Sequence, residues 1–137
     1  MSYPHYSSEC SEYHSVVRDF LGPRPRIVCL CGSTRFFEQF QRANYELTMA
    51  GNIVLSVGCD THSDSELKIA PEQKAMLDEL HKRKIDLADQ VFVLNVGGYI
   101  GPSTRSEIKY ANQLQKPVIY LEPLEPAPEP LHQFADR

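Results

Sequence analysis

The sequence predicts one α/β domain, built on an open parallel sheet of four or five strands with helices on both faces. Short apolar runs of strand length alternate along the chain with longer segments in which apolar residues recur at helical spacing. Strands joined by helices in this way run parallel, with right-handed crossovers. The chain has 137 residues, which fits a single domain.

Four short segments rich in Val, Ile and Leu are predicted as core strands: residues 26–31, 52–56, 90–96 and 117–121. Three amphipathic segments between them are predicted as helices: residues 34–50, 71–88 and 103–115. Gly51 supplies the stop of the first helix, and Pro71 suits the first turn of the second. A further short helix is plausible within residues 13–20.

The predicted domain spans residues 25–121 and is flanked by two segments of different character. Residues 1–24 form an extension before the first clear strand. In residues 122–137 prolines alternate with acidic residues, which is typical of a tail that orders only by docking.

The composition excludes several classes of partner. The net charge is −4, and no Lys/Arg-rich stripe is present, so nucleic acid is not expected as a partner. The longest apolar runs are far shorter than a membrane span. The first residues are polar and show no export signal, so we expect a cytoplasmic location.

The first candidate binding segment follows the first strand and contains Cys31, Gly32, Ser33 and Arg35. Backbone N–H groups at a helix start, a hydroxyl and a guanidinium fork suit a phosphate. The alternative is an ordinary turn, with Ser33 as the cap and Arg35 in solvent. No Gly-Lys-Ser/Thr follows, so the segment is not a Walker loop.

The second segment, residues 97–107, is Gly-rich and opens the last helix. It places Glu107 near a helix N-terminus, where the dipole should hold the carboxylate ionised. The alternative is a supporting role for Glu107, with Ser103 and Ser106 as caps. Candidate ligand contacts here come from four residues of different types: Gly98, Tyr99, Ser103 and Arg105. Tyr99 stacks on a base or anchors the loop, and Arg105 binds phosphate or is solvated.

His81 lies on the apolar stripe of the second helix and should point inward. It is either a buried histidine with satisfied contacts or a catalytic group, and Asp78 or Asp86 is near enough in sequence to orient it. The basic run of residues 82–84 is expected on a solvated helix face. Residues 60–62 (Asp-Thr-His) are a further candidate contact to a base or ribose.

Four cysteines are present, and Cys29 and Cys31 share one face of the first strand. No second Cys-x-Cys or Cys-x-x-Cys accompanies them, so they are expected as reduced, small core residues. No metal site is predicted.

Several of these motifs together resemble the nucleoside 2-deoxyribosyltransferase superfamily. They are Cys-Gly-Ser-x-Arg at 31–35, Leu-Ala-Asp at 87–89, and Ser-Glu-Ile-x-Tyr-Ala at 106–111. Within that superfamily, the Cys-Gly-Ser-x-Arg turn most resembles that of the nucleoside 5′-monophosphate N-glycosidases. The resemblance covers roughly residues 26–121 and implies a three-layer, flavodoxin-like (Rossmann-like) fold.

The resemblance implies cleavage or transfer at the bond between a base and C1′ of a nucleotide or ribosyl phosphate. Glu107 matches the family nucleophile. The family's base-handling Asp is here His81, with Asp78 as a shifted replacement, and Lys109 stands where Gly is usual. No cofactor is implied, and a homodimer or larger assembly is expected because neighbouring subunits often complete these sites. The alternative is a non-catalytic nucleotide sensor of the same fold.

Overall fold

The computed structural model describes residues 24–58 and 69–124. The predicted helix within residues 13–20 and the candidate group at residues 60–62 lie outside these ranges. The same is true of Cys10, Cys59 and the tail from residue 125 onward.

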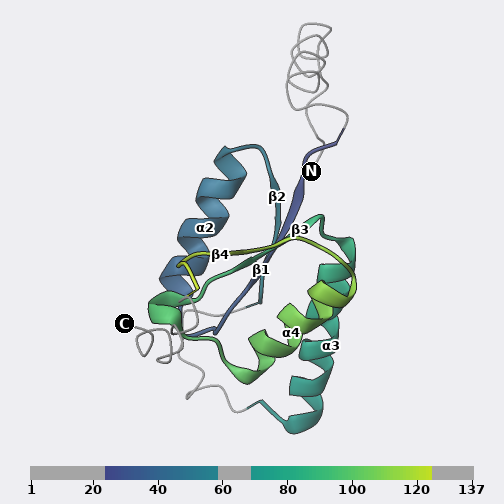
Figure 1. Ribbon diagram of the computed structural model, residues 1–137. Helices are drawn as coiled ribbons and strands as arrows, with labels where there is room; N and C mark the ends of the chain where they lie inside the picture. Colours follow the sequence, from purple (N-terminus) through teal and green to yellow (C-terminus); the bar gives the residue numbers. More distant parts are fainter. Residues whose placement is uncertain (1–23, 59–68, 125–137) are drawn as a thin grey trace, which may run out of the picture.

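The described strands form one parallel sheet in the order β2-β1-β3-β4. The four strands are β1 (Ile27–Cys31), β2 (Ile53–Leu55), β3 (Gln90–Val93) and β4 (Val118–Tyr120). β1 lies at the centre, paired with β2 on one side and with β3 on the other (Figure 1). This arrangement confirms the predicted parallel sheet.

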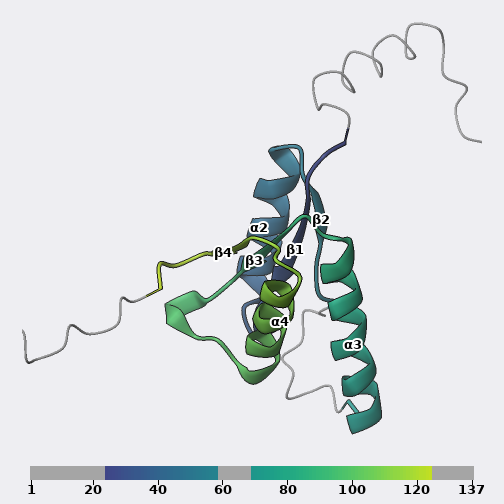
Figure 2. The ribbon, with the colours of Figure 1, turned by 45° about the vertical axis from the view of Figure 1, so that its right-hand side comes forward.

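Helices cover both faces of the sheet. α2 (Phe37–Met49) packs on one face, while α3 (Pro71–Leu87) and α4 (Pro102–Gln113) pack side by side on the other (Figure 2). The three predicted layers are therefore confirmed. Among the described residues, no helix is both long enough and apolar enough to cross a membrane.

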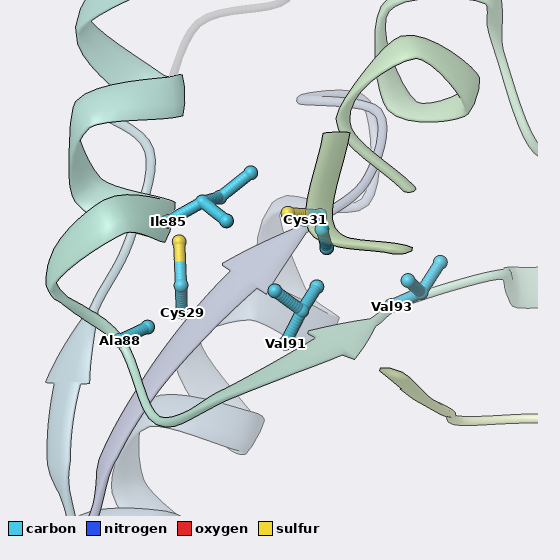
Figure 3. Packing of buried hydrophobic residues seen from close by; sticks show 7 residues of the cluster. Cys29, Cys31, Ile85, Ala88, Val91 and Val93 are labelled. Carbon is cyan, nitrogen blue, oxygen red and sulfur yellow. The ribbon is translucent and has the colours of Figure 1, made fainter. Parts of the chain in front are cut away.

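The alternation of side chains along β1 divides the core in two. On the α2 face lies one buried cluster: Val28, Leu30, Phe40, Ala43 and Leu94. On the face of α3 and α4 lies a second: Cys29, Cys31, Ile85, Ala88, Val91, Val93 and Ala111 (Figure 3). The predicted placement of both cysteines on one face is confirmed, and that face is the one that carries α3.

The helix ends follow the predicted signals. Pro71 occupies the first position of α3, and Gly51, with φ of 91°, follows α2. β3 ends earlier than predicted, because the side chain of Asn95 turns to the backbone of Glu122 and the chain enters a short 3₁₀ turn, η1 (Val96–Gly98). α2 starts at Phe37 because the backbone first makes a turn, which is closed by a hydrogen bond from the N–H of Phe36 to the carbonyl of Ser33.

Two polar contacts fix the junctions of helices and strands away from the carboxyl edge. Asp89 accepts hydrogen bonds from the guanidinium of Arg24 and from the backbone N–H of Ile27. The Nζ of Lys116 donates to the carbonyls of Ile85, Asp86 and Ala88 at 2.6–2.7 Å, which satisfies the last turn of α3.

Candidate active site

The two predicted segments meet in one pocket at the carboxyl edge of the sheet. The strand order reverses beside β1, which is where ligands bind in open α/β sheets. The pocket has a volume of about 470 Å³. The turn after β1 contributes Gly32, Ser33 and Thr34, and the start of α4 contributes Ser103, Thr104 and Glu107. Residues about seventy positions apart in sequence therefore share one cavity.

Gly32 sets the path of the turn after β1. Its φ is 156°, and an added Cβ would lie 3.2 Å from both the Cβ and the carbonyl oxygen of Leu94. A side chain at this position would therefore strain the backbone and press on the core. The turn brings Ser33 to the pocket wall.

Arg35 and Tyr99 form the rim beside this turn. The guanidinium lies 4.3 Å from the centre of the Tyr99 ring, and it donates to Ser33 Oγ at 3.1 Å and to the Tyr99 hydroxyl at 3.3 Å. Ser33 and Tyr99 line the pocket, whereas Arg35 stands behind them and is exposed. Arg35 is therefore placed to orient both side chains.

The Gly-rich loop is anchored to the chain after β4. The backbone N–H of Gly98 donates to the carboxylate of Glu122. The side-chain amide of Asn95 donates to the backbone carbonyl of Glu122 and accepts a hydrogen bond from the backbone N–H of Glu122. Gly98 thus lies in the anchor and not among the residues that line the pocket, and the exposed Arg105 is also outside that lining.

Glu107 is buried in the second turn of α4, between Thr104 and Ala111 on the same helix face. Burial raises the pKa of its carboxyl group, and this effect outweighs the opposing charge of His81 and the hydrogen bond of Cys31. Burial therefore opposes the predicted effect of the helix dipole, which favours the carboxylate form. The alternative with Ser103 and Ser106 as caps is not seen, because Gly101 occupies the N-cap position of α4 and no side chain caps it.

His81 points inward from α3, as predicted. Its Nε2 lies 3.4 Å from Cys31 Sγ, 3.6 Å from Cys29 Sγ and 3.9 Å from Glu107 Oε2. Burial lowers the pKa of His81, but the contacts with Cys29 and Glu107 outweigh it, so the net shift is upward. Neither Asp78 nor Asp86 is among these contacts of His81: Asp78 pairs with Lys74, and Asp86 accepts a hydrogen bond from the hydroxyl of Tyr110.

The prediction that Cys29 and Cys31 are reduced, small core residues is confirmed. Both are free and fully buried, and their sulfur atoms face His81 beneath the pocket. A hydrogen bond from Cys31 lowers the pKa of Cys29 to about 5, with His81 adding to the effect. The same contact and burial raise the pKa of Cys31. Cys31 is thus placed under Glu107 and His81 instead of at the pocket wall.

Sequence reasoning missed two lysines of the pocket. Lys84, expected on a solvated face, lines the pocket and donates to the carbonyl of Ser56 at 2.7 Å. Lys74 also lines it and binds both Asp78 at 3.2 Å and Ser103 Oγ at 3.1 Å. The helical spacing of Lys74, His81 and Lys84 places them on one side of α3, and this signal was present in the sequence.

No protein-family model matches this chain, and no curated protein matches it. Among solved structures, the chain is similar to a 2-deoxyribosyltransferase from the psychrotolerant bacterium Bacillus psychrosaccharolyticus. The likeness has a TM-score of 0.52 at 18% identity and covers 74% of this chain and 75% of that chain. It confirms the predicted fold class.

Proposed function

We propose that this protein cleaves the N-glycosidic bond of a nucleotide or related ribosyl phosphate, by hydrolysis or by transfer of the glycosyl group. The observation that carries the proposal is the shared pocket, in which the carboxyl group of Glu107 and the turn of Gly32 and Ser33 line one cavity of about 470 Å³. A cavity of this size suits a small molecule. The fold likeness to a 2-deoxyribosyltransferase supports the same class of reaction.

Glu107 is the proposed nucleophile or charge stabiliser. As the C1′–N bond breaks, its electron pair leaves with the base and positive charge develops on the sugar. A carboxylate oxygen below C1′ stabilises that charge or forms a bond to C1′, and water or a second base then attacks C1′ and releases the carboxylate. Burial at 10% side-chain exposure keeps competing water away from this group.

Asp78 and His81 take different proposed roles. Asp78 lines the pocket with a half-exposed carboxylate, so it is placed to hold or protonate the departing base. The Nε2 of His81 faces Glu107 from below, where a positive charge favours the carboxylate form of Glu107. His81 therefore acts through Glu107.

The phosphate is proposed to bind at the turn after β1. The backbone of Gly32 and the hydroxyl of Ser33 face the pocket, and Arg35 holds Ser33 and Tyr99 from behind. Tyr99 is then in position to contact the sugar or the base. Ser103, which binds Lys74, lines the opposite wall.

We also propose a homodimer or larger homo-oligomer. α3 exposes an apolar stripe with side chains at helical spacing: Met76, Leu80 and Leu87. Leu80 and the half-exposed Leu77 also line the pocket, so a second copy packed there would lie at its mouth. Light scattering on the wild type and on Leu87→Glu tests this, because a monomeric wild type would contradict it.

The function is tested by incubating the protein with a panel of ribo- and deoxyribonucleoside monophosphates and measuring the released base. Glu107→Gln should lower kcat by at least about 100-fold, since nucleophile removal abolishes the covalent route. Glu79→Gln, an exposed carboxylate paired with Arg83 on α3, is the control and should match wild type. Tight nucleotide binding without any released base would favour the alternative, a nucleotide sensor.

A further inference from the structure

Cys29, Cys31 and His81 form a compact group of buried donor atoms. Their two sulfur atoms and one ring nitrogen all lie within 4.8 Å of one another. Each of the three residues is at most 5% exposed. Among residues 24–58 and 69–124, no other group of three His, Cys, Asp or Glu side chains brings its ligand atoms this close together.

The topology explains how the group forms. Side chains two positions apart on a strand share a face, so β1 presents both sulfur atoms toward α3 (Figure 3). α3 packs on that face through Ile85, and His81, one turn earlier on the same helix face, reaches the same point. Two ligands from a strand and one from a helix thus converge without any loop.

The separations match those that a tetrahedral metal ion imposes. With zinc–sulfur bonds of about 2.3 Å and zinc–nitrogen bonds of about 2.0–2.1 Å, a tetrahedral angle separates sulfur and nitrogen by about 3.5–3.6 Å. The observed distances from His81 Nε2 are 3.4 Å to Cys31 Sγ and 3.6 Å to Cys29 Sγ. The ring nitrogen that faces the sulfur atoms also faces Glu107 Oε2 at 3.9 Å.

We propose that Cys29, Cys31 and His81 bind a soft divalent cation, of which Zn²⁺ is the best fit, directly beneath the pocket. Thiolate and imidazole ligands select zinc over magnesium and calcium. Two thiolates balance the two charges of the ion, so a buried site needs no further counter-charge. Glu107 lies beside the three ligands, with its Oε2 3.9 Å from His81 Nε2.

The proposed metal site is separate from the proposed glycosidic function and does not depend on it. In a zinc-loaded chain His81 is a neutral ligand, so the positive charge that the proposed function assigns to His81 belongs to the zinc-free chain. Metal content and thiolate charge transfer are measured without substrate, so a failure of one proposal is distinguishable from a failure of the other.

The test begins with the wild-type chain, purified under reducing conditions, incubated with Zn²⁺ and desalted before elemental analysis. We expect about one zinc per chain. Replacement by Co²⁺ should produce the intense near-ultraviolet absorption of thiolate-to-cobalt charge transfer. This spectrum needs no variant, so it tests the site even if variants fold poorly.

Three variants then assign the ligands: Cys29→Ser, Cys31→Ser and His81→Asn. Each should weaken zinc binding by more than the 10- to 100-fold typical of losing an outer-shell partner, and each cysteine variant should reduce the cobalt absorption. The double variant Cys10→Ser/Cys59→Ser removes the other two thiols and should bind zinc as wild type does. Zinc should also raise the melting temperature of the wild type.

Two results would overturn the proposal. One is wild-type protein that takes up no zinc and gives no charge-transfer band with cobalt. The other is zinc that stays bound in Cys29→Ser and Cys31→Ser but is lost in Cys10→Ser/Cys59→Ser.

Discussion

Nε2 of His81 lies 3.9 Å from Oε2 of Glu107, and both side chains are almost closed off from solvent, at 6% and 10% exposure. The two residues come from neighbouring helices, α3 and α4, which pack on the same face of the sheet. Burial raises the pKa of Glu107, and the charge of His81 opposes that rise. The ionisation of Glu107 is therefore set first by burial, and the charge of its neighbour on α3 reduces that effect.

The first prediction concerns the pH dependence of base release. Glu107 acts as a carboxylate, and its pKa lies above the ordinary value, so kcat/KM should rise with pH through an acid limb displaced upward. His81→Asn removes the opposing positive charge, and the limb should move to still higher pH. The loss of activity is therefore expected to be larger at low pH than at high pH.

Lys82→Asn is the matched control for that profile, since Lys82 lies one residue away on α3 and its Nζ is placed over the Tyr110 ring. The acid limb of the pH profile of Lys82→Asn should coincide with that of the wild type. A limb that stays in place or moves to lower pH in His81→Asn would show that the two residues are not coupled as described.

The second prediction concerns the phosphate. Arg35→Ala removes the guanidinium that holds Ser33 and Tyr99, so KM for a nucleoside monophosphate should rise by about 10- to 100-fold, the equivalent of a charge-assisted hydrogen bond. Arg42→Ala, on the exposed side of α2 and paired with Glu46, should leave KM unchanged. Because Arg35 also holds Tyr99, KM for unphosphorylated nucleosides should rise as well but by less, and an equally large rise would argue against a phosphate at this turn.

The third prediction concerns the turn itself. Gly32→Ala forces a side chain onto a backbone with φ of 156° and against Leu94, so the free energy of unfolding should fall by about 1–3 kcal/mol. Gly58→Ala is the comparison, because Gly58 lines the same pocket and an added Cβ there meets no heavy atom within 4 Å. Urea denaturation measures both, and equal stabilities would contradict the assigned strain.

The fourth prediction concerns Lys116, which closes the last turn of α3 through three carbonyls. Lys116→Met keeps the apolar stem and removes the ammonium group, so the free energy of unfolding should fall by about 1.5–3 kcal/mol. Lys109→Met, at an exposed position of α4, should change the unfolding free energy by less than about 0.5 kcal/mol. Matching melting curves for the two variants would refute the capping role.

The fold could be predicted from the sequence because its signals are local. Strands show as apolar runs, and Pro71 and Gly51 mark helix ends where the structure has them. The convergence of the two segments followed from topology, since parallel strands end at one edge. The inward direction of His81 followed from its place on the same stripe as Ile85.

Other parts of the site depend on packing between segments far apart in sequence. The group of Cys29, Cys31 and His81 joins residues about fifty positions apart, and no local spacing signals such a contact. Lys84 was misplaced because a run of basic residues resembles a solvated face, although Lys84 lines the pocket and only Arg83 of the run is exposed. The upward shift of the Glu107 pKa could not be predicted, because helix position is visible in the sequence and burial is not.

The most direct measurement is a crystal structure of Glu107→Gln with a deoxyribonucleoside monophosphate that the wild type cleaves or, if none is cleaved, one that it binds. We expect C1′ of the sugar within about 3.5 Å of the side chain at position 107, the reach of a near-attack geometry. The phosphate should rest on the backbone of Gly32 and Ser33. A nucleotide whose phosphate lies instead between Lys74 and Lys84, with C1′ turned away from position 107, would contradict the account.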